Sequence, residues 1–537
     1  MKKLFNNFTF NPKDDVLSGL TVALALVPEA VAFAFVAGID PLVGLYGAFM
    51  MGIVTSIFGG RPGMISGATG AMAVVMVHMI QKGNEVGQSL DVPIEYLGLQ
   101  WLFITLLLVG LIQCFAGILK LGKFVRLIPH PVMMGFVNGL AIVIFLSQLN
   151  LFKENKAGVN DWLSGYDLYV MLGLVALTMI IMFLLPKLTK KIPAALVAIV
   201  SVAALTIFGG INVNTVGSFI IDSGGTGLEG SLPSFQYQIF SLFSTIEGNW
   251  GLVVSTAFLL AAVGLIESLM TLNLVDELTE SRGSGNRECL AQGGANILNG
   301  LFGGMGGCAM IGQSIINVNS GGRGRLSGIV ASVALLCFIL FGAPLIEQIP
   351  IAALVGVMFM VVVGTFAWSS FRIIRKIPIS DAVVLIVVSA VTVWQDLAIA
   401  VVVGVIISAL VFAWKNAIMI RARKRIKNDG SKVYEIWGPL FFGSVQNFMA
   451  KFDVKNDPQK IEIDFIESKV NDHSGIEAID NVVKKYIKAG KKVRLTHLSP
   501  ECKTLLLKAD PSFNKIIQSS IDDPRYYVVT DLMDDEV

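Results

Sequence analysis

Long apolar stretches alternate with short polar segments over most of the chain, from about residue 16 to about residue 414. A helix needs roughly 20 consecutive, mostly apolar residues to cross the hydrocarbon core of a membrane. About eleven stretches reach this length, beginning near Val16, Leu42, Tyr96, Ile128, Asp167, Ile192, Leu252, Leu326, Ile351, Asp381 and Leu397. The pattern predicts a polytopic α-helical membrane domain.

Three further apolar segments are too short or too interrupted to cross on their own: Thr69–Ile80, Leu290–Phe302 and Cys308–Val318. Counting them gives about fourteen helices. With that number the basic residues flanking the helices, Lys153 and Lys156 excepted, fall on the side of the N-terminus, which the positive-inside rule makes cytoplasmic. We expect a multi-pass protein of the cell (inner) membrane, with a cytoplasmic N-terminus at residues 1–15 and a cytoplasmic C-terminus.

The composition narrows the function further. The chain of 537 residues is 54% hydrophobic and 15% charged, and its mean hydropathy of +0.71 is too high for ordinary soluble domains. The net charge of +2 and the placement of Lys and Arg at helix ends argue against nucleic-acid binding. The five cysteines are scattered, without metal-ligand spacing. No Ser-His-Asp, P-loop or dinucleotide-binding motif stands in a usable context, so we expect neither an enzyme nor a cofactor, and transport driven by gradients.

The membrane domain, residues 16–420, divides near Asn249 into two similar halves, roughly 16–210 and 250–420. In each half a long first helix carries one acid in an apolar setting, Glu29 and then Glu267. A glycine-interrupted segment follows two elements later. Interrupted segments at corresponding places in two halves are typical of inverted repeats with a binding site at their interface. The pattern predicts two repeats of seven helices.

The two interrupted segments read MISGATGAM (64–72) and GGMGGCAMIGQS (303–314). In the first we expect an extended piece followed by a half-helix beginning near Gly70, capped by Thr69 or Ser66. In the second, Cys308–Ile311 opens a half-helix. Half-helix N-termini inside a membrane favour an anion, through free N–H groups and the helix dipole. The alternative is that the glycines only permit tight helix packing. The expected substrate-binding residues are Ala68, Thr69, Gly70, Cys308, Ala309, Met310, Glu29 and Phe33.

The acid in the second half suggests a coupling ion. Thr271 lies one helical turn after Glu267, on the same face. A carboxylate, a hydroxyl and freed backbone carbonyls suit either Na⁺ or a proton. The alternative is a protonated carboxyl held by a hydrogen bond between helices. The expected coupling-ion residues are Glu267, Thr271, Ala309, Met310 and Gly312, with Na⁺ placed at the first two.

The charged end of the chain differs from the rest. Residues 421–431 are strongly basic, and we expect a linker there. From residue 432 to residue 537, strand patterns such as KVYEIWGPLFFGSV and KIEIDFIES alternate with helical ones such as HSGIEAIDNVVKKYIKAG. Alternating strands and helices predict a small α/β domain.

Several segments, in order, resemble the SulP family of inorganic anion transporters, relatives of animal pendrin and prestin: VPEAVAFAFVAGIDPLVGLYGAF, ISGATGAMAVV, ESLMT and GCAMIGQSIINVNSGGRGRLSG. The resemblance implies two intertwined seven-helix repeats, divided into a core and a gate. It places the anion between the third and tenth helices, where Thr69 and Gly70 face Cys308, Ala309 and Met310. The tail resembles the STAS domain of this family, which implies a homodimer or a cytoplasmic regulator.

Three positions qualify the resemblance. Cyanobacterial bicarbonate members of the family hold Na⁺ with an Asp at the position of Glu267 and a threonine at the position of Thr271. The glutamate in this chain weakens the case for Na⁺ and leaves a proton as the alternative coupling ion. Many animal members carry an arginine where this chain has Gln313. Ser474 occupies the place of the phosphorylated serine of related anti-sigma-factor antagonists, and its alternative role is to cap the helix that follows.

The sequence therefore predicts a secondary active transporter of a small inorganic anion, of bicarbonate or sulfate type, working by alternating access. The same residues leave two alternatives open. One is a nucleobase or dicarboxylate carrier of the same fold. The other is a membrane anion sensor that signals through its STAS domain.

Overall fold

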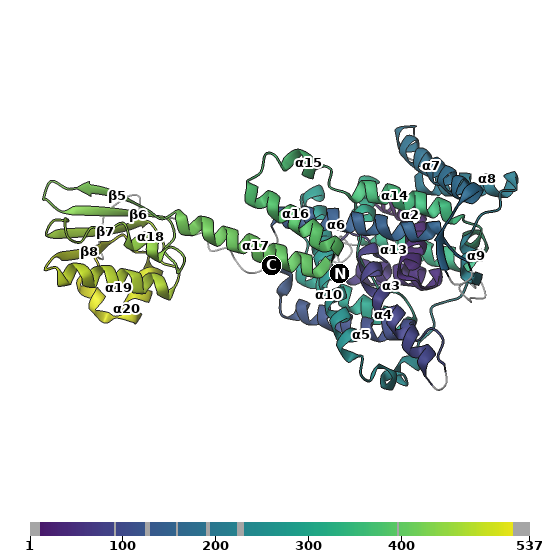
Figure 1. Ribbon diagram of the computed structural model, residues 1–537, viewed down its shortest axis with the longest axis horizontal. Coiled ribbons are helices and arrows are strands. Elements are labelled where there is room, and N and C mark those ends of the chain that lie inside the picture. Colours follow the sequence, from purple (N-terminus) through teal and green to yellow (C-terminus); the bar gives the residue numbers. More distant parts are fainter. Residues whose placement is uncertain are drawn as a thin grey trace. The chain divides into compact units, whose positions relative to one another are not determined.

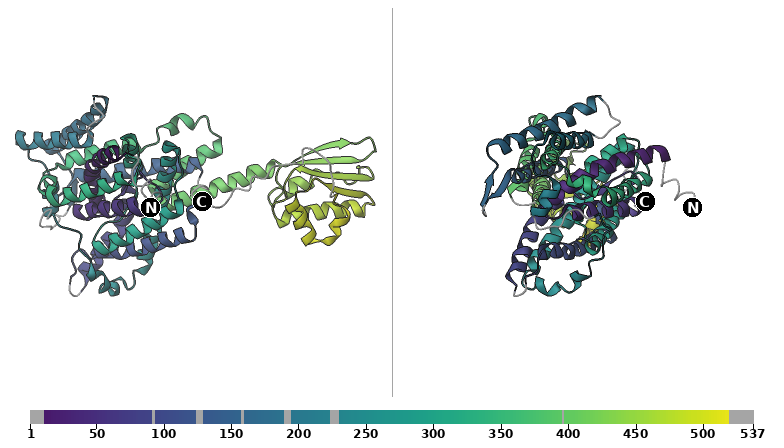
Figure 2. Two further views of the ribbon diagram at one scale, coloured as in Figure 1. Left: turned by 180° about the vertical axis from the view of Figure 1, so that it is seen from behind. Right: turned by 90° about the vertical axis from the view of Figure 1, so that its right-hand side faces the viewer.

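The computed structural model describes residues 11–90, 93–123, 129–156, 159–188, 194–222, 230–394 and 397–518. The chain divides into two compact units, Met1–Val405 and Ile406–Val537, and the division falls within the helix Leu397–Ile418, α17. Figures 1 and 2 show that the first unit is built of helices and that the second combines a sheet with helices.

The described elements of the first unit follow one another in this order: α2 (Pro12–Ala37), α3 (Pro41–Phe58), β1 (Ser66–Gly67), α4 (Gly70–Ser89), α5 (Leu97–Ile118), α6 (His130–Gln148), η2 (Leu149–Phe152), β2 (Lys153–Lys156), β3 (Val159–Trp162), α7 (Gly165–Leu188), α8 (Ala194–Gly209), α9 (Val216–Asp222), η3 (Tyr237–Phe240), η4 (Phe243–Ile246), α10 (Trp250–Thr279), α11 (Gly285–Phe302), β4 (Cys308–Ala309), α12 (Ile311–Asn319), α13 (Arg325–Glu347), α14 (Ile351–Thr365), α15 (Ser369–Ile373) and α16 (Ile379–Trp394).

The helices account for the expected membrane domain. Among the described residues, eight helical segments are long and apolar enough to cross a membrane, and three shorter apolar helices accompany them. The three segments expected to be interrupted form α4, α11 and α12. α4 extends beyond the expected end to Ser89, and α11 begins at Gly285, five residues before the expected start. The predicted polytopic helical fold is confirmed.

The two half-helices lie between the two acid-bearing helices. α4 packs against both α2 and α10, and α12 packs against the same two helices. Each half of the chain therefore supplies one broken helix and one long helix to a shared centre. This reciprocal packing is what inverted repeats produce when their interrupted segments meet.

The second unit contains a four-stranded sheet in the order β5-β6-β7-β8, in which the first pair is antiparallel and the others are parallel. Its buried core includes Tyr434, Phe448, Phe465, Tyr486 and Leu506. Its elements are β5 (Arg421–Ile426), β6 (Lys432–Trp437), α18 (Val445–Met449), β7 (Lys460–Glu467), α19 (His473–Lys488), β8 (Lys492–Thr496), α20 (Pro500–Ala509) and η5 (Pro511–Lys515). The predicted α/β domain is confirmed, and Figure 1 shows α19 and α20 side by side.

The expected linker at 421–431 is wrong in its first half. Arg421–Ile426 form the edge strand β5, which pairs antiparallel with β6 from Arg421 opposite Trp437 to Ile426 opposite Lys432. Five of its six side chains are exposed, so the strand has almost no apolar face that a hydrophobic pattern could reveal. Basic side chains are common on edge strands because they discourage pairing with another chain.

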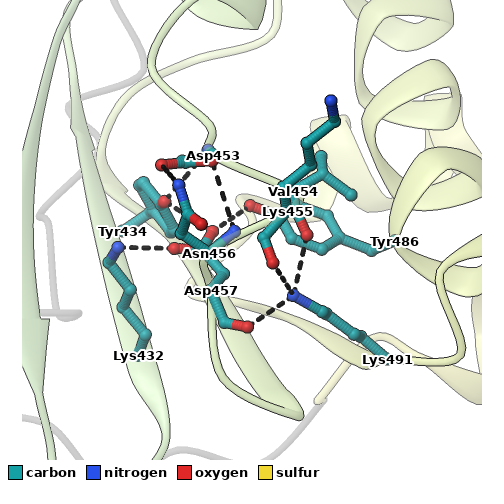
Figure 3. Close-up of polar contacts among 9 residues, drawn as sticks. All are labelled: Lys432, Tyr434, Asp453, Val454, Lys455, Asn456, Asp457, Tyr486 and Lys491. Atoms are coloured by element: carbon teal, nitrogen blue, oxygen red, sulfur yellow. Dashed lines mark hydrogen bonds and ion pairs between the residues drawn. The ribbon is translucent and has the colours of Figure 1, made fainter.

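A buried carboxylate holds the loop before β7 (Figure 3). Asp457 Oδ1 accepts a hydrogen bond from Lys432 Nζ at 2.5 Å, and its Oδ2 accepts bonds from the hydroxyls of Tyr434 at 2.6 Å and Tyr486 at 2.5 Å. Lys491 Nζ donates to the backbone oxygen of Asp457. Burial would raise the pKa of the Asp457 carboxyl, but the three side-chain hydrogen bonds together hold that pKa below its usual value.

Replacing Asp457 by alanine should lower the free energy of unfolding of this unit by roughly 3 kcal/mol, because a lysine and two tyrosines lose a buried partner. Hydrogen exchange of β6 and β7 in the whole protein measures the effect. The exposed Asp453, in the same loop, is the control. Its carboxylate accepts two hydrogen bonds from Asn456 but is not buried, so Asp453→Ala should lower stability much less than Asp457→Ala does. Equal effects of the two substitutions would contradict the assignment.

The contribution of Asp457 should also depend on pH in one direction. Its folded pKa is depressed, so the stabilisation is present above the unfolded value of about 3.9 and disappears as the pH falls through the lower folded value.

Candidate functional site

The two interrupted segments cross at the centre of the first unit. β1 and β4 pair antiparallel, with Ser66 opposite Ala309 and Gly67 opposite Cys308. A Cβ atom at Gly307 would lie 2.0 Å from the carbonyl oxygen of Gly67, so only glycine allows this approach. β1 leads within three residues to α4, and β4 leads within two residues to α12. The crossing therefore brings two helix N-termini together in the interior.

Two of the expected backbone donors are already used by the protein. The N–H of Ala309 donates to Ser268 Oγ at 3.1 Å, and the N–H of Met310 donates to the carbonyl oxygen of Ile65 at 2.9 Å. The Ala309 side chain is fully buried, in a cluster with Met64, Leu272, Val275 and Val318. Ala309 and Met310 therefore shape the crossing and do not offer these N–H groups to a ligand.

The first turns of the two half-helices hold other donors. The first N–H groups of a helix have no acceptor within it. Here they belong to 70–72 in α4 and 311–313 in α12. Thr69 occupies the expected N-cap position of α4, but its side chain makes no capping hydrogen bond, and neither does that of Met310 at α12. Each half-helix thus leaves its positive end uncapped by its own N-cap side chain.

Side chains of α2 border these first turns. A Cβ atom built on Gly70 would lie 2.7 Å from Phe33 Cε1, so the Phe33 ring rests on the start of α4. Glu29, one turn before it, lies beside the side chain of Gln313. The Gln313 Oε1 atom is buried and has no hydrogen-bond partner among the described residues. Gly312 is exposed, and a Cβ built on it meets nothing within 4 Å. Open space therefore adjoins the N-terminus of α12.

The second acid is linked to the crossing by a thiol. Cys308 Sγ donates to Glu267 Oε2 at 3.0 Å, and it also lies 3.2 Å from Thr69 Oγ1. Thr271 Oγ1 donates to the backbone oxygen of Glu267 at 2.8 Å, which leaves its lone pairs free to accept or to coordinate. A chain of polar contacts thus joins Glu267 to the N-cap residue of α4. The cysteine pattern gave no signal of this link.

The serine singled out in the second unit lies inside α19. The helix begins at His473, and its N-cap is Asp472, whose Oδ1 accepts the N–H of Gly475 at 2.9 Å. The alternative role of Ser474 as the cap is therefore wrong, because the aspartate two residues earlier takes that position. The half-buried Ser474 side chain stands in the first turn of the helix.

Polar residues of the neighbouring helices also reach the crossing, and the sequence pattern did not single them out. They are Gln113 on α5, Ser268 on α10 and Gln292 and Asn296 on α11, all fully buried. A polar side chain inside an apolar stretch is a weak signal on its own, because its partner lies far away in the sequence.

Comparison with known proteins gives two family matches. The profile described as the sulfate permease family matches residues 13–388, and the STAS domain profile matches residues 419–523. A Bacillus subtilis (strain 168) protein described as a putative sulfate transporter, YbaR, is 40% identical over 509 residues, which cover 93% of this chain and 99% of that protein.

Two solved structures are similar to this chain. The transmembrane domain of a cyanobacterium bicarbonate transporter, BicA, has a TM-score of 0.61 and 30% sequence identity, covering 74% of this chain and 99% of that one. The murine anion transporter Slc26a9, in the inward-facing state, has a TM-score of 0.76 and 17% identity, covering 95% and 90% of the two chains. The first similarity concerns sequence and fold, and the second concerns the fold.

Proposed function

The chain belongs to the sulfate permease family of anion transporters, and from this premise we propose that it is a secondary active transporter of a small inorganic anion, of bicarbonate or sulfate type, coupled to Na⁺ or H⁺. It is a multi-pass membrane protein with a STAS domain. The observation that carries the proposal is the crossing of β1 and β4, which directs two half-helix N-termini to one place.

In this proposal the anion lies between the first turns of α4 and α12. The N–H groups of 70–72 and 311–313 donate to it, and the two helix dipoles supply the positive potential. Thr69 and Phe33 border the same space, and Cys308, Ala309 and Met310 hold the shape of the opposite strand. The residues named at the crossing carry no positive charge, and Glu29 and Glu267 stand beside it. This favours a monovalent anion such as bicarbonate over divalent sulfate.

The coupling ion is proposed to bind at Glu267. A carboxylate beside the Thr271 hydroxyl offers the oxygen atoms that Na⁺ prefers, and the same carboxylate can take a proton. Either event removes negative charge next to Cys308 Sγ, 3.0 Å from the carboxylate. Because the thiol also contacts Thr69, at the entry to α4, the ion and the anion then influence each other through two side chains.

The remaining expectations complete the proposal. The protein works by alternating access, in which the anion site opens in turn to one side of the plasma membrane and then to the other. Both termini lie in the cytoplasm. The protein works as a homodimer, and the STAS domain, with Ser474 in the first turn of α19, is the place for a regulator.

Uptake of labelled bicarbonate and sulfate into proteoliposomes, under an imposed Na⁺ or pH gradient, tests this function. We expect accumulation of at least one anion above its equilibrium level with one of the two gradients. A nucleobase carrier would ignore both anions, and a sensor would bind an anion without accumulating it. Either outcome would contradict the proposal.

A further inference from the structure

One face of α11 carries a row of buried polar side chains. Glu288, Gln292 and Asn296 follow one another at intervals of four residues, and Asn299 continues the row. Each is at most 1% exposed. Residues four apart lie above one another on a helix, and polar groups in a membrane interior cost free energy unless they find partners. The partners of this row therefore indicate what it does.

The row contacts both strands of the crossing. Gln292 Nε2 donates to Ser66 Oγ in β1 at 2.9 Å. Asn296 pairs with the backbone of Gly307, directly before β4: its Nδ2 donates to the Gly307 oxygen at 3.1 Å, and its Oδ1 accepts the Gly307 N–H at 3.0 Å. Asn296 Nδ2 also donates to Gln113 Oε1 at 2.9 Å, and Gln292 is braced by Glu288 Oε1 at 2.7 Å. One helix thus holds two segments that are more than 200 residues apart.

The spacing of the two amides matches the spacing of the two strands. Residues four apart on a helix are separated by about 6 Å along its axis, and neighbouring strands lie about 4.8 Å apart. Two side chains one turn apart can therefore each reach one strand of the pair. A single amide could fix either strand, but it could not fix the distance between them.

We propose that Gln292 and Asn296 are positioning residues, which set the separation and register of β1 and β4 and thereby the geometry of the anion site between α4 and α12. The inference rests on the proposed function, because it concerns that same site. Neither residue touches the anion. Each acts through the strand that it holds, so its loss changes the affinity for the anion and the discrimination between anions.

Asn299 provides a matched control. It is an asparagine in the same row, equally buried, but its Nδ2 donates to the Ala295 oxygen within α11 at 2.9 Å. Among the described residues, the Asn299 side chain makes no hydrogen bond to either strand, so Asn299→Ala removes a buried amide without releasing the crossing. A role limited to helix stability would make the two asparagines equivalent.

The test compares Asn296→Ala, Gln292→Ala and Asn299→Ala in proteoliposomes, with labelled bicarbonate and sulfate. Because small misplacements of a site have large effects, we expect Asn296→Ala to raise the KM for the transported anion about tenfold or more, with a smaller change in the maximal rate. Gln292→Ala should act in the same direction, and Ser66→Ala added to it should bring little further change. The preference between the two anions should shift in both single variants. Asn299→Ala should keep the KM within about twofold, as expected for a change that leaves the site geometry intact.

The proposal is overturned if well-folded Asn296→Ala and Gln292→Ala keep the wild-type KM and anion preference, or if Asn299→Ala changes them equally. If Asn296→Ala fails to fold, Gln292→Ala and Ser66→Ala decide by the same readouts. The two proposals fail in different ways. If only the positioning proposal is wrong, the wild type takes up the anion and the variants have the same KM and anion preference as the wild type. If the wild type neither takes up nor binds an anion, the proposed function is refuted, and this inference with it.

Discussion

Glu267→Gln is expected to abolish ion-driven accumulation of the anion while anion exchange down a gradient continues. Glutamine keeps the shape of the side chain but can neither release a proton nor neutralise a cation. At one-to-one coupling, a tenfold ion gradient supports about tenfold accumulation, because a tenfold ratio corresponds to about 1.4 kcal/mol. The variant should instead stop at the equilibrium level. Concentrative uptake under Na⁺ and pH gradients, with exchange assayed in parallel, measures the difference.

A second acid on the same helix is the control for this experiment. Glu277 is exposed and lies near the end of α10, ten residues after Glu267. Glu277→Gln should accumulate the anion as the wild type does. If accumulation and ion dependence both survive in Glu267→Gln, the coupling assignment is wrong. Glu29, which contacts Gln313 from the other repeat, then becomes the residue to test.

Gly312→Leu is expected to lower the rate of anion uptake roughly 100-fold, because the site must hold the anion within a fraction of an ångström. Gly312 stands in the first turn of α12, where an added side chain meets open space. The leucine would enter that space without disturbing the packing behind the helix. Ala309 is unsuitable for such a test. Its methyl group is buried against Leu272 and Val275, so a larger residue there would disrupt the fold.

Gly294→Leu is the matched control for the glycine substitution. A Cβ on Gly294 also meets nothing within 4 Å, and the residue lies two positions after Gln292 on α11, away from the polar row. Its uptake should resemble that of the wild type. Near-normal uptake and affinity in a well-folded Gly312→Leu variant would contradict the proposed site.

The sequence predicted the features that depend on local pattern. The half-helix α4 begins at Gly70, as the change from MISGAT to apolar periodicity indicates. The second interruption forms α12 from Ile311. Glycine spacing and an apolar run are properties of a short segment, and they sufficed to place both broken helices and the acid-bearing helices α2 and α10.

The exact partners across the crossing could not be predicted. The inverted-repeat pattern indicates that the two interrupted segments meet, but no local pattern pairs Ser66 with Ala309. The sequence also does not predict that the Ala309 N–H donates a hydrogen bond to the Ser268 hydroxyl. Arg61 is one of the basic residues between the apolar stretches. Its side chain is only 6% exposed, and its Nε lies 3.1 Å from Asp276 Oδ1. Composition identifies a charged residue but does not reveal whether a distant acid pairs with it in the interior.

The position of a bound anion tests the central claim most directly. Anomalous diffraction from crystals of the whole protein, grown with selenate or bromide after showing which of them competes with uptake, locates that ion. The account predicts a peak within hydrogen-bonding distance of the first-turn N–H groups of α4 and α12, at 70–72 and 311–313. A competing ion found anywhere else, with these N–H groups uncontacted, would contradict it.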